Sequence, residues 1–531
     1  MRYDAVVVGA GPNGLASANK LADAGWSVLL LEAQTEVGGA VRSDRELDPE
    51  FVHDTFSAFY PLAASSRGLA AFGLEEHGLA WRHAPAVLGH PLPDGRWALL
   101  HRDRQVTARL MDEQHPGDGD AWLDLCAVWD RIGDPLVSAL VSPFPPVRPG
   151  LSLLTRLRGA GGLDLVKTLL TPAMELGRRG FGGESAGLLV AGNAGHADLP
   201  LDAPGSGVFG LLLTMLGQTV GFPVPEGGAG RLSQALARRL ESLGGEILCD
   251  SEVAHVVVEH GRAVGVITTD GRRYDAGRAV VADVSATRLF GGLVDAAHLP
   301  ARVNRGMRDF QLDPGTVKVD WALDGTLPWA SPPAHAPGTF HVADSVSEMT
   351  EALGQVAAGV IPARPFLLAG QMTTSDPTRS PAGTESLWAY THVPQPDRTV
   401  RDAGEGGVRG VWDASDCERF ADRMQARIER LAPGFGSRVR ARRVLGPREL
   451  EARNANLVGG AINGGTAQLH QQLFLRPVPG LLGRPETGVP GLYLGSASAH
   501  PGGGVHGAPG LNAARAALLH HRLGRLNPRR R

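Results

Sequence analysis

Length, composition and charge describe an ordinary globular protein. The chain has 531 residues, 43% hydrophobic and 20% charged, which is enough for two or three domains with sizeable cores. A formal net charge of −3 gives no reason to expect a nucleic-acid partner. The cysteines, Cys126, Cys249 and Cys417, are odd in number and widely spaced, which excludes a dithiol-relay disulfide reductase and favours a reducing compartment.

The amino-terminal segment has the pattern of a dinucleotide-binding unit. A β-branched run at 3–8 predicts a buried parallel strand, a helix is expected over 15–24 with a cap at Gly25, and 27–31 predicts a second strand. A G-x-G-x-x-G motif joins the first strand to the helix: Gly9, Ala10, Gly11, Pro12, Asn13 and Gly14. Gly9 would make the tight turn, Gly11 would admit a pyrophosphate, and Gly14 would let helix and strand pack closely. The helix N-terminus would offer N–H groups to the phosphates.

Glu32 closes the second predicted strand. It lies 18 residues beyond Gly14, near the spacing of about 20 expected for an acid that binds an adenosine ribose. Its charge would repel a 2′-phosphate, so NADP is disfavoured. Many glycine turns serve only as turns, but strand, helix, second strand and acid together favour a nucleotide site.

A second glycine pair follows this acid. The chain continues from Glu32 and Ala33 to Gly38, Gly39, Ala40, Val41 and Arg42. This resembles the E-x5-GG extension of the glutathione-reductase-type and amine-oxidase-type flavoproteins. In those proteins the glycine pair lets the backbone pass beside the flavin half of an extended FAD, which an NAD site does not require. They usually place Arg directly after the pair, whereas two residues intervene here.

Two later segments look like further parts of the same nucleotide-binding domain. Residues 225–230 (PEGGAG) precede a predicted helix over 232–243, and short β-rich runs at 253–259, 263–268 and 279–282 predict a hairpin or meander on the parallel sheet. The stretch resembles the GG-x-G helix and adenine-contacting strand of the same flavoproteins. On that resemblance Val253 would offer its backbone to the adenine.

The segment 492–518 (LYLGSASAHPGGGVHGAPGLNAARAAL) carries the most specific likeness. It resembles the carboxyl-terminal flavin motif of bacterial phytoene desaturases and relatives, among them retinol saturase and pyridine nucleotide-disulfide oxidoreductase domain-containing protein 2. The resemblance implies flavin contacts from a set of five residues: Gly495, Ser496, Gly503, Gly504 and Val505. A second dinucleotide site is not expected, because no Asp or Glu occurs after Glu486. The helix from Leu511 would instead direct its N-terminal dipole at the N1/O2 edge of the flavin.

The resemblance covers most of the chain, strongly at both ends and faintly between 90 and 220. It implies an α/β protein: a Rossmann-like FAD-binding domain of the glutathione-reductase type with an inserted α+β substrate domain. The FAD domain would comprise 1–85, 225–290 and 479–525. The substrate domain would comprise 86–224, helical and apolar, and 291–478, with a mixed sheet and helices. Residues 526–531 would form a basic tail.

The first part of the predicted substrate domain is rich in Leu, Gly and Pro. Helical pieces are expected at 152–158, 163–171 and 208–215. Residues 203–225 carry no charge, but their glycines and prolines favour a buried or substrate-lining segment over a membrane span. An apolar entrance would suit a lipophilic substrate, and the arginines of the tail (Arg522, Arg525, Arg529, Arg530 and Arg531) could contact anionic headgroups, although such a tail is usually only solvated.

Candidate catalytic residues come from four places. Lys318, in a predicted strand at 316–322, is similar in position to the lysine that amine oxidases hold through water against flavin N5; it could also be a strand lysine that reaches solvent. Alternation places Tyr390 and His392 with Trp388 on one strand face, which could line a pocket or pack in the core.

Histidines near the last glycine segment are further candidates. His500 precedes the glycine turn and could position substrate or donate to the flavin, or simply cap the turn. His506 lies inside the turn. His196 and Asp198, in a loop that begins near residue 191, could reach the pocket. No metal-ligand spacing and no G-x-S-x-G elbow appears.

The family resemblance implies an FAD-dependent oxidoreductase, a desaturase or dehydrogenase. Hydride would pass from a substrate C–H to flavin N5 while a proton leaves the neighbouring atom, which gives a C=C or C=N bond. Oxygen or a quinone would reoxidise the flavin, because no separate NAD(P) domain is visible. Alternatives are oxidation of an amine or amino acid, and a flavin-bound scaffold without turnover. A nucleotide-binding strand at residue 3 leaves no room for a signal peptide, so we expect a cytoplasmic protein, which could also associate peripherally with a membrane.

Overall fold

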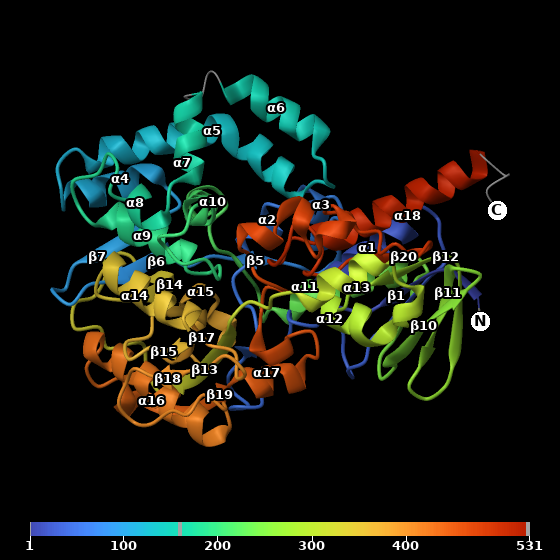
Figure 1. Ribbon diagram of the computed structural model, residues 1–531. Coiled ribbons are helices and arrows are strands. Elements are labelled where there is room, and N and C mark those ends of the chain that lie inside the picture. Colours follow the sequence, from blue (N-terminus) through green and yellow to red (C-terminus); the bar gives the residue numbers. More distant parts are fainter. Residues whose placement is uncertain (1, 158–161, 527–531) are drawn as a thin grey trace.

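The computed structural model describes residues 2–157 and 162–526 (Figure 1). Arg158, the last residue of one expected helix, lies outside these residues, as do the tail arginines at 529–531. Two large sheets dominate the molecule: the first lies at the right of Figure 1 and the second at the lower left.

The first sheet unites strands from distant parts of the chain. Its order is β10-β11-β12-β1-β2-β9, and β20 pairs with β12. The bounds are β1 Arg2–Val8, β2 Val28–Leu31, β9 Glu246–Leu248, β10 Val253–Glu259, β11 Arg262–Thr268, β12 Arg273–Ala282 and β20 Leu492–Leu494. β1, β2, β9, β12 and β20 run parallel, whereas β10, β11 and β12 form an antiparallel meander. The three segments assigned to the FAD domain therefore contribute to one Rossmann-like sheet.

The second sheet belongs to the inserted segments. Its order is β19-β13-β17-β16-β14-β6-β7, and it is antiparallel except where β14 meets β6. The bounds are β6 Ala86–Pro91, β7 Trp97–Leu100, β13 Gly315–Leu323, β14 Pro337–Val342, β16 Leu367–Gln371, β17 Glu385–Val393 and β19 Val439–Leu445. Short pairs add β3 Ser43–Asp44 with β4 His53–Asp54, β5 Trp81–Arg82 with β8 Val224–Pro225, and β15 Val360–Ile361 with β18 Arg401–Asp402.

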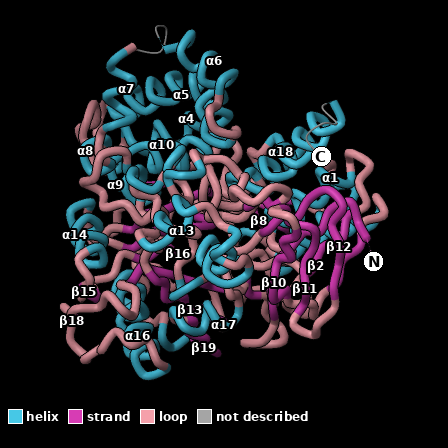
Figure 2. The backbone as a smooth tube through the Cα atoms, turned by 45° about the vertical axis from the view of Figure 1, so that its right-hand side comes forward, coloured by secondary structure: helices cyan, strands magenta, loops and turns pink. Residues whose placement is uncertain are grey.

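Helices cover both sheets, as the cyan tubes of Figure 2 show. Around the first sheet they are α1 Pro12–Ala22, α2 Pro61–Ala64, α3 Arg67–Ala70, α11 Gly230–Ser242, α12 Ala286–Arg288, α13 Ala301–Arg308 and α18 Ala508–Leu526. Between β7 and β8 the chain forms α4 Arg104–Asp112, α5 Asp118–Val141, α6 Val147–Leu157, α7 Leu163–Leu170, α8 Ala173–Leu176, α9 Ser185–Ala194 and α10 Ser206–Thr219. The remaining helices are α14 Val346–Ala357, α15 Met372–Ser375, α16 Ala414–Leu431 and α17 Pro447–Arg453.

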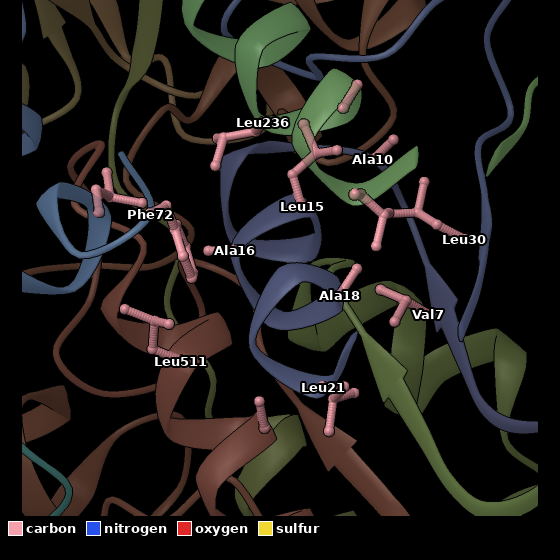
Figure 3. Close-up of a cluster of buried hydrophobic side chains, with 14 of the residues drawn as sticks. Val7, Ala10, Leu15, Ala16, Ala18, Leu21, Leu30, Phe72, Leu236 and Leu511 are labelled. Atoms are coloured by element: carbon pink, nitrogen blue, oxygen red, sulfur yellow. The ribbon is translucent and has the colours of Figure 1, made fainter. Parts of the chain in front are cut away.

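The core beneath the first sheet combines large apolar side chains with alanines that let the helices approach one another. Ala16 and Ala18 of α1 are fully buried, and Leu236 of α11 and Leu511 of α18 pack into the same cluster (Figure 3). α1 ends at Ala22, earlier than the expected helix, and Asp23 is its C-cap; Gly25 follows in the left-handed conformation with φ 76°. This packing brings the first and last glycine segments together.

The uncharged segment 203–225 contains α10. This helix has 14 residues, and Gly210, Leu211 and Met215 are buried against its neighbours. α10 packs on α9, so the segment is interior to the helical part of the insertion. Within 2–157 and 162–526, no helix has both the length and the apolar character that crossing a membrane requires.

Candidate functional site

The first glycine motif connects β1 to α1. Gly9 has φ 92°, and Gly11 is the N-cap of α1, with Pro12 at its first position. A Cβ on Gly14 would lie 2.0 Å from the carbonyl oxygen of Gly9, so only glycine permits this approach of helix and strand. The geometry is that of a phosphate-binding turn.

Glu32 and the chain entering β10 lie beside this turn. The Glu32 side chain is 7% exposed, and it accepts hydrogen bonds from the backbone N–H groups of Ala10, at 2.7 Å, and Gln34, at 3.0 Å. Its own carbonyl accepts the Ser251 N–H at 2.8 Å. Val253, 7% exposed, begins β10 two residues later, whereas Ala33 is exposed. Glu32 and Val253, the predicted ribose and adenine contacts, are thus close to each other. Their roles in nucleotide binding stay predictions.

The second glycine pair packs onto the first motif. Gly38 donates its N–H to the Ala10 carbonyl at 2.8 Å, and a Cβ on Gly39 would lie 3.0 Å from the Cα of Gly11. Gly38 and Gly39 have φ 126° and 55°, which favour glycine. The Ala40 carbonyl accepts the hydroxyl of Ser57 at 2.7 Å. The chain is therefore free of side chains where the two segments meet.

Arg42 is hydrogen-bonded to the backbone of this turn. Its Nε donates to the Gly39 carbonyl at 3.1 Å, and its NH2 donates to the Arg453 carbonyl at 3.1 Å. Val41 is fully buried, and its carbonyl accepts the Ser233 hydroxyl. The two intervening residues thus place Arg42 where it holds the backbone of the glycine pair.

The third glycine segment closes on the first. Gly495 follows β20, and the Ser496 hydroxyl accepts the Ser498 N–H at 3.2 Å. A Cβ on Gly510, in the first turn of α18, would lie 1.9 Å from the Asn13 carbonyl oxygen, so α18 and α1 are in backbone contact. The turn before α18 contains Gly503, Gly504 and Val505, and a Cβ on Gly503 would lie 2.9 Å from Asn463 Oδ1.

These residues fit FAD. The glycines leave no side chains where their loops converge. Three buried polar atoms near these loops have no hydrogen-bond partner among the described residues: Asn13 Oδ1, Asn463 Nδ2 and His500 Nδ1. An extended nucleotide with polar edges would satisfy such atoms. The sequence predicted the glycines as flavin contacts, whereas Asn463 was not among the predicted contacts.

Asp283, at the end of β12, is a site residue that sequence reasoning missed. Its carboxylate accepts the Gly14 N–H at 2.7 Å. Burial raises its pKa to about 7, and the charge of Glu32 acts in the same direction. An acid directly after the predicted strand 279–282 was the available signal.

Lys318 lies in a buried ionic cluster and does not reach solvent. The side chain is 3% exposed, Nζ donates to the Asp54 carbonyl at 2.9 Å, and it pairs with Asp320. Arg443 binds Asp320 at 2.8 Å and Asp44 at 2.7 Å. Burial lowers the pKa of Lys318. Because Asp44 and Asp54 follow the second glycine pair, the cluster connects the second sheet to the segment after that pair.

The predicted face of β17 is a row of aromatic rings. Trp388 and Tyr390 stack with centroids 6.0 Å apart, and His392 lies 5.8 Å beyond Tyr390. The Tyr390 hydroxyl is 3.0 Å from His196 Nδ1. His392 and Asp198 line a cavity of about 280 Å³, where burial raises the pKa of Asp198 to about 6.

His500 and His506 have different surroundings. His500 Nε2 lies 3.0 Å from the Ser142 carbonyl, beyond α5, and its ring meets Phe144 edge-on at 6.3 Å. His506 Nδ1 accepts the Ala508 N–H at 3.1 Å at the start of α18. His506, not His500, therefore caps the helix that follows the turn.

Sheet topology and three convergent glycine segments define a flavin-binding oxidoreductase. The family model for flavin containing amine oxidoreductase matches residues 13–286, more than half of the chain, and the chain belongs to this family. It is 29% identical to pyridine nucleotide-disulfide oxidoreductase domain-containing protein 2 of Rattus norvegicus, over 96% of this chain and 92% of that one. It is 27% identical to hydroxyneurosporene desaturase of Cereibacter sphaeroides, over 97% of each.

Solved structures share the fold. An oxidoreductase from Methanosarcina mazei has a TM-score of 0.61 and 17% identity, covering 98% of this chain and 100% of that one. A putrescine oxidase variant has a TM-score of 0.59 and 18% identity, covering 98% and 99%. With the family match and the desaturase relative, the chain is an FAD-dependent oxidoreductase that acts on a small molecule and passes electrons to an acceptor.

Proposed function

We propose that the chain is a dehydrogenase or desaturase that removes hydride and a proton from a lipophilic small molecule, leaving a C=C or C=N bond. FAD, when bound, supplies the hydride acceptor. The aromatic face of β17 carries the proposal. Phe59 lies 6.0 Å from Trp388, which stacks on Tyr390, and Phe59 follows Ser57, which is bound to Ala40 of the second glycine pair. The apolar row therefore begins at the flavin segment.

The surroundings of this row suit an apolar substrate. Ala58, Val224 and Met372 pack with Trp388. Leu211 and Met215 of the uncharged α10 belong to the core cluster on which Tyr390 packs. Apolar contact gains about 25 cal/mol per Å² of buried surface, so an extended substrate would be oriented by its length. The same walls would exclude water from the reacting carbon.

Polar groups beside the row would act on the proton and on substrate position. Tyr390 and His392 are our candidates for contact with substrate, with His196 orienting the Tyr390 hydroxyl. His500, beside the last glycine turn, is a candidate near the flavin. For Lys318 we propose a positioning role through Asp54, because its ammonium is already bound.

The acceptor and location follow from the same proposal. Oxygen or a quinone would take the electrons. A cytoplasmic protein whose surface touches a membrane would meet a lipophilic substrate and a quinone in the same place. The name of hydroxyneurosporene desaturase, a relative over nearly the whole chain, supports a desaturation of this kind.

Oxidation of an amine is a second candidate. The Trp388 and Tyr390 rings are inclined by only 21°, and such a ring pair can guide an amine toward a flavin. The fold shared with putrescine oxidase is compatible with this reaction.

Anaerobic titration of the purified protein tests both candidates. The oxidised-flavin band near roughly 450 nm is followed while polyenes, amines and reduced nicotinamides are added in turn. Bleaching by a saturated lipophile supports the proposal, and bleaching by an amine supports the second candidate. Bleaching only by NAD(P)H would reverse the electron flow and contradict both, and no bleaching would favour a scaffold. Gly11→Ala and Glu32→Ala, which should lose flavin, are the controls.

A further inference from the structure

The helices α6 and α7 expose a set of large apolar side chains. Val147 and Leu151 of α6 are 70% and 62% exposed, and Leu163, Val166 and Leu170 of α7 are 86%, 39% and 57% exposed. Their spacings, four along α6 and three and four along α7, place them on one face of each helix. Both helices stand at the upper edge of the molecule in Figures 1 and 2. Single exposed leucines are ordinary, but five large apolar side chains exposed on two helices that pack on the same residue, Ile132, indicate an interaction surface.

Each of these helices is anchored on α5 by another apolar side chain. Leu153 of α6 and Leu169 of α7 pack on Ile132 of α5, which is fully buried. The apolar residues that anchor these helices are therefore different from the exposed ones. The exposed side chains take no part in the packing on Ile132. We call the five exposed residues Val147, Leu151, Leu163, Val166 and Leu170 the α6–α7 face.

The charge around the α6–α7 face points to an anionic partner. Arg148 and Arg156 of α6 and Lys167 of α7 are exposed, and residues 147–170 contain Asp164 as their single acid. The whole chain, by contrast, has a net charge of −3. Two copies meeting through this face would oppose like charges, whereas apolar side chains bordered by cations match a membrane interface with anionic headgroups.

The segment that leads into α6 lies beside the residues that precede the last glycine turn. The chain enters α6 through Ser142 and Phe144, and the Ser142 carbonyl is 3.0 Å from His500 Nε2. Phe144 lies 5.5 Å from Phe474, which is 44% exposed. Phe144 also lies 6.3 Å from the His500 ring, so these aromatic side chains lie between α6 and the residue that precedes the last glycine turn.

We propose that the α6–α7 face docks the protein on an anionic lipid bilayer. The apolar side chains enter the acyl boundary while Arg148, Arg156 and Lys167 meet the headgroups. This inference rests on the proposed function, because a lipophilic substrate would then pass from the bilayer toward His500 without crossing water. Beyond the proposed function, the inference names the surface that meets the membrane and the charge of the lipids.

Vesicle flotation of the flavin-loaded protein tests the proposal. The vesicles are phosphatidylcholine alone and phosphatidylcholine mixed with phosphatidylglycerol. The test variant is Leu151→Glu with Leu163→Glu. The control variant is Leu243→Glu with Val400→Glu, two residues that are 43% and 74% exposed on other elements. We expect flotation with the mixed vesicles for the wild type and the control, and a loss of about tenfold or more for the test variant, because two apolar contacts become acidic.

Several results would overturn the proposal. They are equal flotation of test and control variants, no flotation of the wild type, and a wild-type dimer in light scattering that only the test variant loses. Flavin absorbance and thermal melting of each variant show that it is folded. Donor-dependent bleaching in detergent, measured on the same proteins, tests the proposed function separately. Absence of bleaching would contradict the proposed function without affecting the flotation result, and absence of flotation would contradict the docking proposal without affecting the bleaching result.

Discussion

The Asp283 carboxylate accepts a hydrogen bond from the Gly14 backbone N–H, with 2.7 Å between the two atoms. A Cβ on Gly11 would lie 2.6 Å from the same carboxylate oxygen. The Asp283 carboxylate therefore lies against the first turn of α1, beside the position where the glycine motif is predicted to bind a pyrophosphate. Burial raises the pKa of Asp283 to about 7, so its charge changes near neutral pH.

FAD binding should consequently depend on pH through Asp283. Phosphate charge beside the carboxyl group would favour its protonated form, so affinity should fall as pH rises above about 7. In Asp283→Asn the amide oxygen can still accept from Gly14, and the profile should be flatter. Flavin fluorescence during titration of the apo-protein measures both, and identical profiles would contradict this role.

The stability of the apo-protein should carry the same signature. The folded-state pKa of Asp283, about 7, lies above its ordinary value of 3.8, so the folded protein holds this proton more tightly than the unfolded chain does. Its contribution to the free energy of unfolding therefore falls as pH rises between these two values. Urea unfolding across that range should show a smaller fall for Asp283→Asn than for the wild type.

Gly14→Ala should abolish flavin binding. The new Cβ would meet the Gly9 carbonyl oxygen at 2.0 Å, and backbone cannot retreat as a flexible side chain can. Gly354→Ala in α14 is the matched control. In the part of the chain that the structure describes, nothing outside the helix's own backbone lies within 4 Å of the new Cβ, so the free energy of unfolding should rise by about 0.5–1 kcal/mol. The ratio of flavin to protein absorbance is the measurement, and a Gly14→Ala protein with full flavin content would refute the close packing.

Lys318→Met should destabilise the protein by about 3–5 kcal/mol, because it leaves Asp320 buried with one partner fewer. Lys167→Met, at an exposed lysine, should change the free energy of unfolding by about 0.5 kcal/mol or less. Urea unfolding compares them. If Lys318→Met unfolds like the wild type but bleaches slowly with a donor, a direct role in catalysis replaces the positioning role.

Tyr390→Phe removes the contact of the Tyr390 hydroxyl with His196 and keeps the ring stacked on Trp388. We expect a loss of about 1 kcal/mol in stability and slower donor-dependent bleaching, measured by stopped flow. Trp388→Phe, which keeps an aromatic ring in the row, should weaken substrate binding and leave the Tyr390–His196 pair in place. A wild-type rate in Tyr390→Phe would remove the hydroxyl from the mechanism.

Much of the first sheet could be predicted from the sequence. The strand, glycine turn and helix at 3–24 form from residues that are neighbours in the sequence. A positive φ, as at Gly9 and Gly38, favours glycine, so such turns can be recognised in the sequence. Alternation likewise placed Tyr390 beside Trp388. The ends of helices were less certain, because caps such as Asp23 depend on the turn that follows.

The sequence by itself determined the first strand, glycine turn and helix, because local backbone requirements depend on local residues. It predicted one flavin-type nucleotide site for all three glycine segments through their resemblance to known flavoproteins. Tertiary structure alone decided the partners: Asp283 with Gly14 across 269 positions, Lys318 with the carbonyl of Asp54, and Tyr390 with His196. Such pairs leave no spacing or period in the chain, because they exist only where separate strands and loops are packed together. Buried charge and hydrogen-bond geometry, and hence the pKa of Asp283 and the fixed ammonium of Lys318, follow from that packing.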